Sequence, residues 1–300
     1  FNIQENDVSV TGMIDRAKLA KGYITDEYLK PYAIFKNDMK DTYVDEMEIC
    51  SEFEEGIVKQ EFQVFYQPVV DARTGKIVSA EALVRWLHEQ KGWISPGQFI
   101  PALEKGGYIS QLDRYMIEKV TGCLDQRRAE KKRFVPVSVN LSWMDFYDEN
   151  MLEWIVRGLK KNNPNEQKIR FEITETSLAA IGENHTRMLM HLKENGAEIL
   201  LDDFGSGYSS FGMLQDYDFD ILKMDISFVR NIGVNKKSES ILRAIIDMAH
   251  QLEIRLVAEG AETEEQVAFL RENGCDYIQG YYYYKPMPEK EFLQLLDEGK

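Results

Sequence analysis

Short apolar runs alternate with longer amphipathic segments along the chain from about residue 62 onward. The runs have the length and the β-branched and aromatic content of buried strands, and the segments between most of them repeat their apolar positions with a helical period. We expect helices at 113–132, at 188–193 and from Ser238 onward. The expected strands are 62–70, 76–86, 134–142, 168–175, 198–203, 219–225, 254–260 and 276–281.

Eight strands that alternate with helices over roughly 240 residues predict an α/β fold, a TIM-like (β/α)₈ barrel. The first two strands are joined only by "DARTGK", residues 71–76. A parallel crossover needs about a dozen residues or more, so these strands should form an antiparallel hairpin. Gln67 should then lie across from Ala80 or Glu81.

Polar side chains stand at or near the ends of seven of these strands. In a (β/α)₈ barrel the strand ends that meet at the C-terminal face form the active site. We therefore expect these side chains to converge. They are Glu81, Arg85, Asn140, Glu172, Glu175, Asp202, Asp203, Lys223, Asp225, Glu259 and Gln279.

Asp202 and Asp203 follow an apolar run, where two adjacent carboxylates are costly unless something offsets them. Taken alone, the pair reads as a helix cap or a turn. With so many partners it favours a metal site, because oxygen ligands without histidine suit Mg²⁺ or Mn²⁺. Adjacent aspartates can also serve two ions. Asn140 and Glu175 have structural alternatives, and Lys223 could instead pair with Asp225.

The net charge of −15 argues against bulk DNA or RNA binding. A small anion held through a metal remains compatible with it. No apolar stretch is long enough for a membrane span. Three scattered cysteines predict reduced thiols and a cytoplasmic setting. A chain that begins with Phe1 is expected to be a piece of a longer protein, which could be membrane-tethered upstream.

Eight ordered motifs resemble those of the EAL domain family, whose members hydrolyse the bacterial second messenger cyclic di-GMP. They are "YQP" (66–68), "EALVRW" (81–86), "VNLS" (139–142), "FEITET" (171–176), "DDFGSGYSS" (202–210), "LKMD" (222–225), "AEG" (258–260) and "QGY" (279–281). The resemblance implies a phosphodiesterase that opens cyclic di-GMP to linear pGpG, and a homodimer formed through the barrel.

The same resemblance implies a role for each matching residue. It makes Glu81, Asn140, Glu172 and Asp202 ligands of one Mg²⁺ or Mn²⁺, and Asp203 a ligand of a second. Lys223 would lie beside the attacking water, which Glu259 would position or deprotonate; Glu81 and Asp203 also belong to the catalytic group. The substrate contacts would be Gln67, Arg85 and Gln279. Glu175 would anchor the loop that begins at Asp202 and couple it to dimerisation. Ca²⁺ is expected to bind but to support little catalysis.

The chain is expected to divide into three parts. Residues 1–44 resemble, weakly, the C-terminal α+β end of a GGDEF domain, with "MIDRAKLAKG" as a helix and "YAIFKNDM" (32–39) as its last strand. Residues 45–60 are predicted to form an acidic connecting helix, and 61–300 the barrel. One alternative function is a non-catalytic cyclic di-GMP receptor, although the ligand set is complete. An unrelated enolase-type barrel fits less well, because of the hairpin and the "DDFGSG" loop.

Overall fold

The structure is a computed structural model that describes residues 10–21, 32–161, 169–180, 183–205 and 211–299. The chain divides into two compact units. One unit combines Phe1–Glu61 with His88–Tyr108, and the other combines Phe62–Leu87 with Ile109–Lys300.

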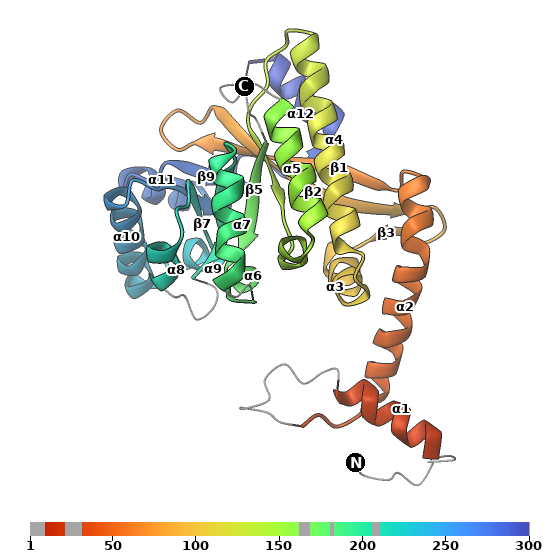
Figure 1. The fold of residues 1–300 in the computed structure, drawn as a ribbon. Helices are drawn as coiled ribbons and strands as arrows, with labels where there is room; N and C mark the ends of the chain where they lie inside the picture. The colour runs from red at the N-terminus through yellow and green to blue at the C-terminus, as the bar shows by residue number, and fades with distance from the viewer. Residues whose placement is uncertain (1–9, 22–31, 162–168, 181–182, 206–210, 300) are drawn as a thin grey trace. The chain divides into compact units, whose positions relative to one another are not determined.

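The first unit is mainly helical in its described residues. Its elements are α1 (Val10–Lys21), α2 (Asn37–Val58), β3 (Gly92–Ile94) and α3 (Pro96–Gly106). Helix α2 includes most of the predicted connecting helix (Figure 1). The strand predicted within 32–39 is wrong: residues 32–36 have no regular secondary structure, and α2 already begins at Asn37. A strand needs a neighbour for its backbone hydrogen bonds, and the described part of 10–36 offers only a helix.

Eight strands of the second unit form a closed ring, and this confirms the predicted barrel. The order around it is β1, β2, β4, β5, β6, β7, β8 and β9, with β1 beside β2 and β9. The strands are β1 (Phe62–Asp71), β2 (Ile77–His88), β4 (Val137–Asn140), β5 (Ile169–Thr174), β6 (Glu198–Phe204), β7 (Ile221–Met224), β8 (Arg255–Glu259) and β9 (Tyr277–Gln279). A short strand, β10 (Met287–Pro288), that the sequence pattern did not predict also pairs with β1.

Strand β1 runs antiparallel to both of its barrel neighbours, whereas the other neighbouring strands are parallel. Gln67 pairs with Glu81, as the short connection predicted. The turn is stabilised by the Asp71 carboxylate, which accepts hydrogen bonds from the backbone N–H groups of Arg73 (3.1 Å) and Thr74 (2.7 Å). Gly75, at φ 68°, closes the turn in the left-handed region.

A layer of apolar side chains lies below the strand ends. Val69, Leu200, Ile221 and Val257 form one buried cluster, with Tyr277 packed against it. Side chains two positions apart on a strand share a face. The residues two positions from these five, toward the end of the barrel where the parallel strands finish, are Gln67, Asp202, Lys223, Glu259 and Gln279. The polar cluster therefore lies on this layer of apolar side chains, which we call the apolar floor.

The helices of this unit follow its strands along the chain, and the longer ones lie on the outer side of the barrel (Figure 1). They are α4 (Ile109–Ala129), η1 (Trp143–Tyr147), α5 (Glu149–Lys161), α6 (Glu175–Ala180), α7 (Glu183–Glu194), α8 (Phe211–Asp216), α9 (Ile226–Arg230), α10 (Lys236–Gln251), α11 (Glu264–Glu272) and α12 (Glu289–Asp297). Helices α4, α7 and α10 confirm the three that were predicted. Among the described residues, no helix combines the length and the apolar character needed to cross a membrane.

Candidate functional site

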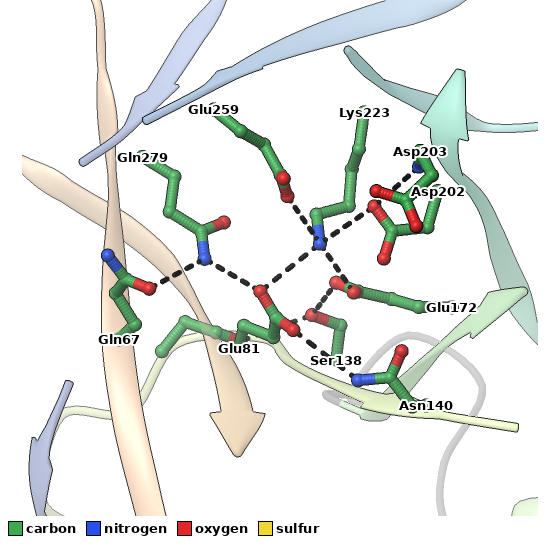
Figure 2. A network of polar contacts seen from close by, with 11 residues as sticks. Gln67, Glu81, Ser138, Asn140, Glu172, Asp202, Asp203, Lys223, Glu259 and Gln279 are labelled. Carbon is green, nitrogen blue, oxygen red and sulfur yellow. Dashed lines mark hydrogen bonds and ion pairs between the residues drawn. The ribbon is translucent and has the colours of Figure 1, made fainter. Parts of the chain in front are cut away.

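Lys223 lies at the centre of the strand ends, surrounded by carboxylates from four other strands (Figure 2). Its side chain is only 2% exposed. The distances from its Nζ are 2.6 Å to Glu172, 2.7 Å to Glu259, 3.1 Å to Glu81 and 3.2 Å to Asp202. A buried ammonium is costly unless it is paired, and these contacts offset that cost. The alternative pairing of Lys223 with Asp225 is not what the structure shows; Asp225 caps α9 instead.

An irregularity in β6 explains how Asp202 and Asp203 both reach the site. Successive side chains of a regular strand point to opposite faces. Pairing between β6 and β7 is regular up to Leu201 and resumes at Phe204, so two residues of β6 lie opposite Lys223 alone. Asp203 has φ 55°, in the left-handed region. A β-bulge of this kind re-aims a side chain.

Amide groups extend the cluster on the side of Glu81 (Figure 2). The Nε2 of Gln279 donates to Glu81 (2.6 Å) and to the Oε1 of Gln67 (3.2 Å). The Nδ2 of Asn140 donates to the other oxygen of Glu81 (3.3 Å). The Asn140 Oδ1 is thereby left as a ligand atom. Both Glu81 oxygens are therefore held in place by side-chain donors.

Ser138 is a site residue that the sequence interpretation missed. Its hydroxyl donates to Oε1 of Glu172, the oxygen that Lys223 does not contact. The signal was present in "VSVN", where Ser138 lies two positions before Asn140 and so shares its face. Ser138 orients a carboxylate without adding charge to the centre.

Burial and crowding shift the protonation of this cluster. Burial raises the pKa of Glu172 well above its usual range, with the Glu81 carboxylate adding to the effect. Burial and Asp202 likewise raise the pKa of Asp203, and burial raises the pKa of Glu259 to about 8 against the opposing effect of Lys223. Burial acts to lower the pKa of Lys223, but the surrounding carboxylates raise it well above its usual range. Lys223 therefore stays protonated, and its single ammonium is shared among four carboxyl groups.

The donor set fits a hard cation. Asp202, Asp203 and Glu259 each offer a carboxylate oxygen, and these oxygens all lie within 4.8 Å of one another. Oxygen ligands without sulfur or imidazole suit Mg²⁺ or Mn²⁺. Glu259 was expected to act on water, and the structure adds it as a possible metal ligand.

Glu175 and Arg85 lie at the edge of this arrangement. Glu175 begins α6 and accepts a hydrogen bond from the backbone N–H of Gly205 (3.2 Å). It therefore contacts the start of the "DDFGSGYSS" motif, whose residues 206–210 lie outside the described residues. Arg85 lies four positions beyond Glu81 on β2, on the same face. Its guanidinium carbon is 5.7 Å from the centroid of the Phe65 ring.

Two relatives of this chain are named as cyclic di-GMP phosphodiesterases. The cyclic di-GMP phosphodiesterase NbdA of Pseudomonas aeruginosa is 32% identical over 252 residues, which are 83% of this chain and 32% of NbdA. The probable cyclic di-GMP phosphodiesterase PdeG of Escherichia coli is 33% identical over 232 residues, 77% of this chain and 46% of PdeG. The chain thus spans a third to a half of the length of these relatives.

A solved structure, described as the PaMucR phosphodiesterase in complex with c-di-GMP, has the same fold. It superimposes with a TM-score of 0.75 at 30% identity, over 82% of this chain and 99% of that one. Residues 51–286 match the EAL domain family. Because this match covers most of the sequence and includes every strand of the barrel, the chain belongs to the EAL domain family.

Proposed function

We propose that this chain is a metal-dependent phosphodiesterase that hydrolyses cyclic di-GMP to linear pGpG in bacterial second-messenger signalling. The observation that carries the proposal is the position of Lys223, within hydrogen-bonding distance of four carboxylates at one end of the barrel. The names of NbdA and PdeG support the reaction, and the ligand in the PaMucR structure supports the substrate.

In this proposal Glu81, Asn140, Glu172 and Asp202 hold one Mg²⁺ or Mn²⁺, and Asp203 helps to hold a second. A divalent cation bound there supplies positive charge to the phosphate oxygens. The carboxylates keep that charge in a fixed place, on the apolar floor of the barrel. Ca²⁺ is expected to bind but to support little hydrolysis, because its coordination is longer and looser.

Lys223 and Glu259 carry the proton chemistry. The Glu259 carboxylate, 2.7 Å from the Lys223 ammonium, positions the attacking water and, in its ionised form, takes a proton from it. Lys223 orients that water and stabilises the negative charge that develops on the phosphate. The water oxygen bonds to phosphorus while the bond from phosphorus to the 3′ oxygen breaks in one of the two phosphodiester linkages. The released 3′ oxygen takes up a proton, returned by Glu259 or supplied by solvent, and linear pGpG results.

Gln67, Arg85 and Gln279 contact the substrate in this proposal. Gln279 is 4% exposed, and its Oε1 has no hydrogen-bond partner among the described residues. A buried acceptor without a partner is costly, so a ligand that donates a hydrogen bond there gains affinity. Guanine and ribose both carry such donors. Arg85 supplies a cation for the phosphates.

Several further predictions belong to the same proposal. Glu175 holds the loop after Asp202 in place and links it to a homodimer formed through the barrel. The GGDEF-like origin of residues 1–44 and a cytoplasmic location also stay predictions.

The test is to mix the purified chain with cyclic di-GMP and Mg²⁺ or Mn²⁺ and to follow pGpG by chromatography. We expect pGpG from the wild type and almost none from Glu81→Ala or Asp202→Asn. Near-normal hydrolysis by either variant in Mg²⁺ would contradict the ligand assignment. Tight binding without pGpG under any metal would identify a receptor instead of an enzyme.

A further inference from the structure

Helix α9 follows β7 and contacts the main chain just beyond the ends of β6 and β8, the two neighbouring strands that carry site carboxylates. It begins two residues after Met224 ends the hydrogen-bonded pairing of β7, and β7 lies between β6 and β8 in the barrel. Its N-cap, Asp225, donates its backbone N–H to the carbonyl of Phe204 on β6 (3.3 Å). The Asp225 side chain accepts from Ser227 N (2.9 Å) and fixes the first turn of the helix.

Phe228 of α9 packs against the backbone just beyond the aspartate pair. Gly205 follows Phe204, and a Cβ added to Gly205 would lie 2.5 Å from Cε2 of the Phe228 ring. Gly205 has φ 90°, a conformation that side-chain-bearing residues rarely adopt. The ring therefore rests directly on the main chain that follows Asp203.

Ile226 makes the equivalent contact beyond Glu259. A Cβ added to Gly260 would lie 2.1 Å from Cγ1 of Ile226, and Gly260 has φ 70°. Two side chains of one helical turn thus press on two glycines, one after each acidic strand end. Val229, which is fully buried, is the residue that holds α9 in the core, whereas Ile226 and Phe228 are only half-buried.

We propose that Ile226 and Phe228 are positioning residues that set the separation between the Asp202–Asp203 pair and Glu259. The inference rests on the proposed function, because that function requires these carboxylates to bind a cation. Their oxygens lie within 4.8 Å of one another. A small cation such as Mg²⁺ demands near-ideal ligand distances, so a drift of either strand end weakens binding.

The test measures Mn²⁺ affinity by calorimetry, together with the melting temperature, for Phe228→Ala, Phe228→Tyr and a matched control, Phe269→Ala. Phe269 is also half-buried, but it lies on α11 against Arg243. We expect Phe228→Ala to bind Mn²⁺ roughly 10–100-fold more weakly. Phe228→Tyr keeps the ring and should recover wild-type affinity, and Phe269→Ala should leave the affinity unchanged. Ile226→Ala should repeat the loss, and Ile226→Val should recover most of it.

The inference is wrong if Phe228→Ala weakens Mn²⁺ binding no more than Phe269→Ala does, or if the wild type binds no Mn²⁺. If Phe228→Ala does not fold, Phe228→Leu takes its place, and unchanged affinity in that variant also overturns the inference. A wild type that binds Mn²⁺ but releases no pGpG contradicts the proposed function and leaves the positioning role to be decided by the same affinities.

Discussion

Asp203 combines a strained backbone conformation with a carboxylate that lies close to a second one. Its backbone lies at φ 55°, and its carboxylate stands beside that of Asp202. Left-handed backbone costs most residues about 1–3 kcal/mol, although Asp and Asn adopt it more readily than others. The gain is the bulge, because only there can two consecutive side chains of β6 face the same centre.

Three substitutions of Asp203 separate the effect of its backbone conformation on stability from the effect of its negative charge. Asp203→Asn tolerates the same φ and removes one crowded negative charge, so its free energy of unfolding in EDTA should equal or exceed that of the wild type. Asp203→Gly should stay within about 1 kcal/mol of the wild type. Asp203→Val should lose about 1–3 kcal/mol. Urea unfolding measures all three. If Asp203→Val were as stable as Asp203→Gly, the backbone at this position would not be strained.

Substitution of Lys223 should impair catalysis much more than it impairs substrate binding. If it acts mainly in the transition state, Lys223→Ala should lower kcat roughly 10²–10⁴-fold and raise KM much less. Calorimetry with cyclic di-GMP in Ca²⁺ should still detect binding, while pGpG release in Mg²⁺ becomes very slow.

The control for this variant is Lys237→Ala, which removes an exposed ammonium near the start of α10. Its kcat and KM should match those of the wild type. Loss of binding in a folded Lys223→Ala protein would make Lys223 a substrate clamp, and an unchanged kcat would remove it from the mechanism.

Sequence alone could predict which residues meet, but not how each is held. The strand-end positions of Glu172, Lys223 and Glu259 follow from the order of apolar runs. The hydrogen bond from Ser138 to Glu172 depends on the rotamers of two buried side chains. The bulge at Asp203 depends on how β6 pairs with β7. Neither leaves a clear mark in the hydrophobic pattern.

At the scale of elements, the β1–β2 hairpin was predictable because its connection is too short for any other geometry. The inner face of α10 was predictable only in part. Of the apolar positions that a helical period places on one face, Leu242, Ile245, Ile246 and Ala249 are buried. Ile241 and Leu252 are 51% and 47% exposed, because they lie at the edges of the apolar stripe. Short elements such as β10 and α9 have too few residues to show a period.

Three charged side chains form ion pairs at the strand ends that lie away from the polar cluster. Glu198 on β6 bonds to Arg170 on β5 and to Arg255 (3.1 Å) on β8. Burial acts to raise the pKa of Glu198, but Arg170 and then Arg255 outweigh it, so that pKa is lowered from about 4.5. A carboxyl with a depressed pKa stabilises the fold above its unfolded pKa, and this contribution is lost as the pH falls through the folded value.

Glu198→Gln should therefore unfold at lower urea concentration than the wild type at about pH 7, and the difference should shrink below about pH 4. Partial exposure keeps the expected effect to about 1 kcal/mol or less. Glu153→Gln, at an exposed pair with Arg157, is the matched control and should show no difference at either pH. A Glu198→Gln effect that grows on acidification would contradict this sign.

At the scale of the whole molecule, the net charge of −15 opposes the binding of a dianionic nucleotide. A bound divalent cation reverses the sign of the field locally. Removal of divalent cations with EDTA should therefore weaken cyclic di-GMP binding by at least tenfold, and Mg²⁺ or Ca²⁺ should restore it. Fluorescence anisotropy of a labelled ligand measures this effect. Equal affinity with and without cations would contradict the role given to the carboxylates.

The most direct test of the central claim uses one sample of the wild-type chain and two assays. Calorimetry in Ca²⁺ reports whether cyclic di-GMP binds, and chromatography after adding excess Mg²⁺ or Mn²⁺ reports whether the ring is opened. We expect binding in Ca²⁺ with little product, followed by conversion to pGpG once Mg²⁺ or Mn²⁺ replaces Ca²⁺. Binding without pGpG in either catalytic metal would contradict it, and so would failure to bind at all.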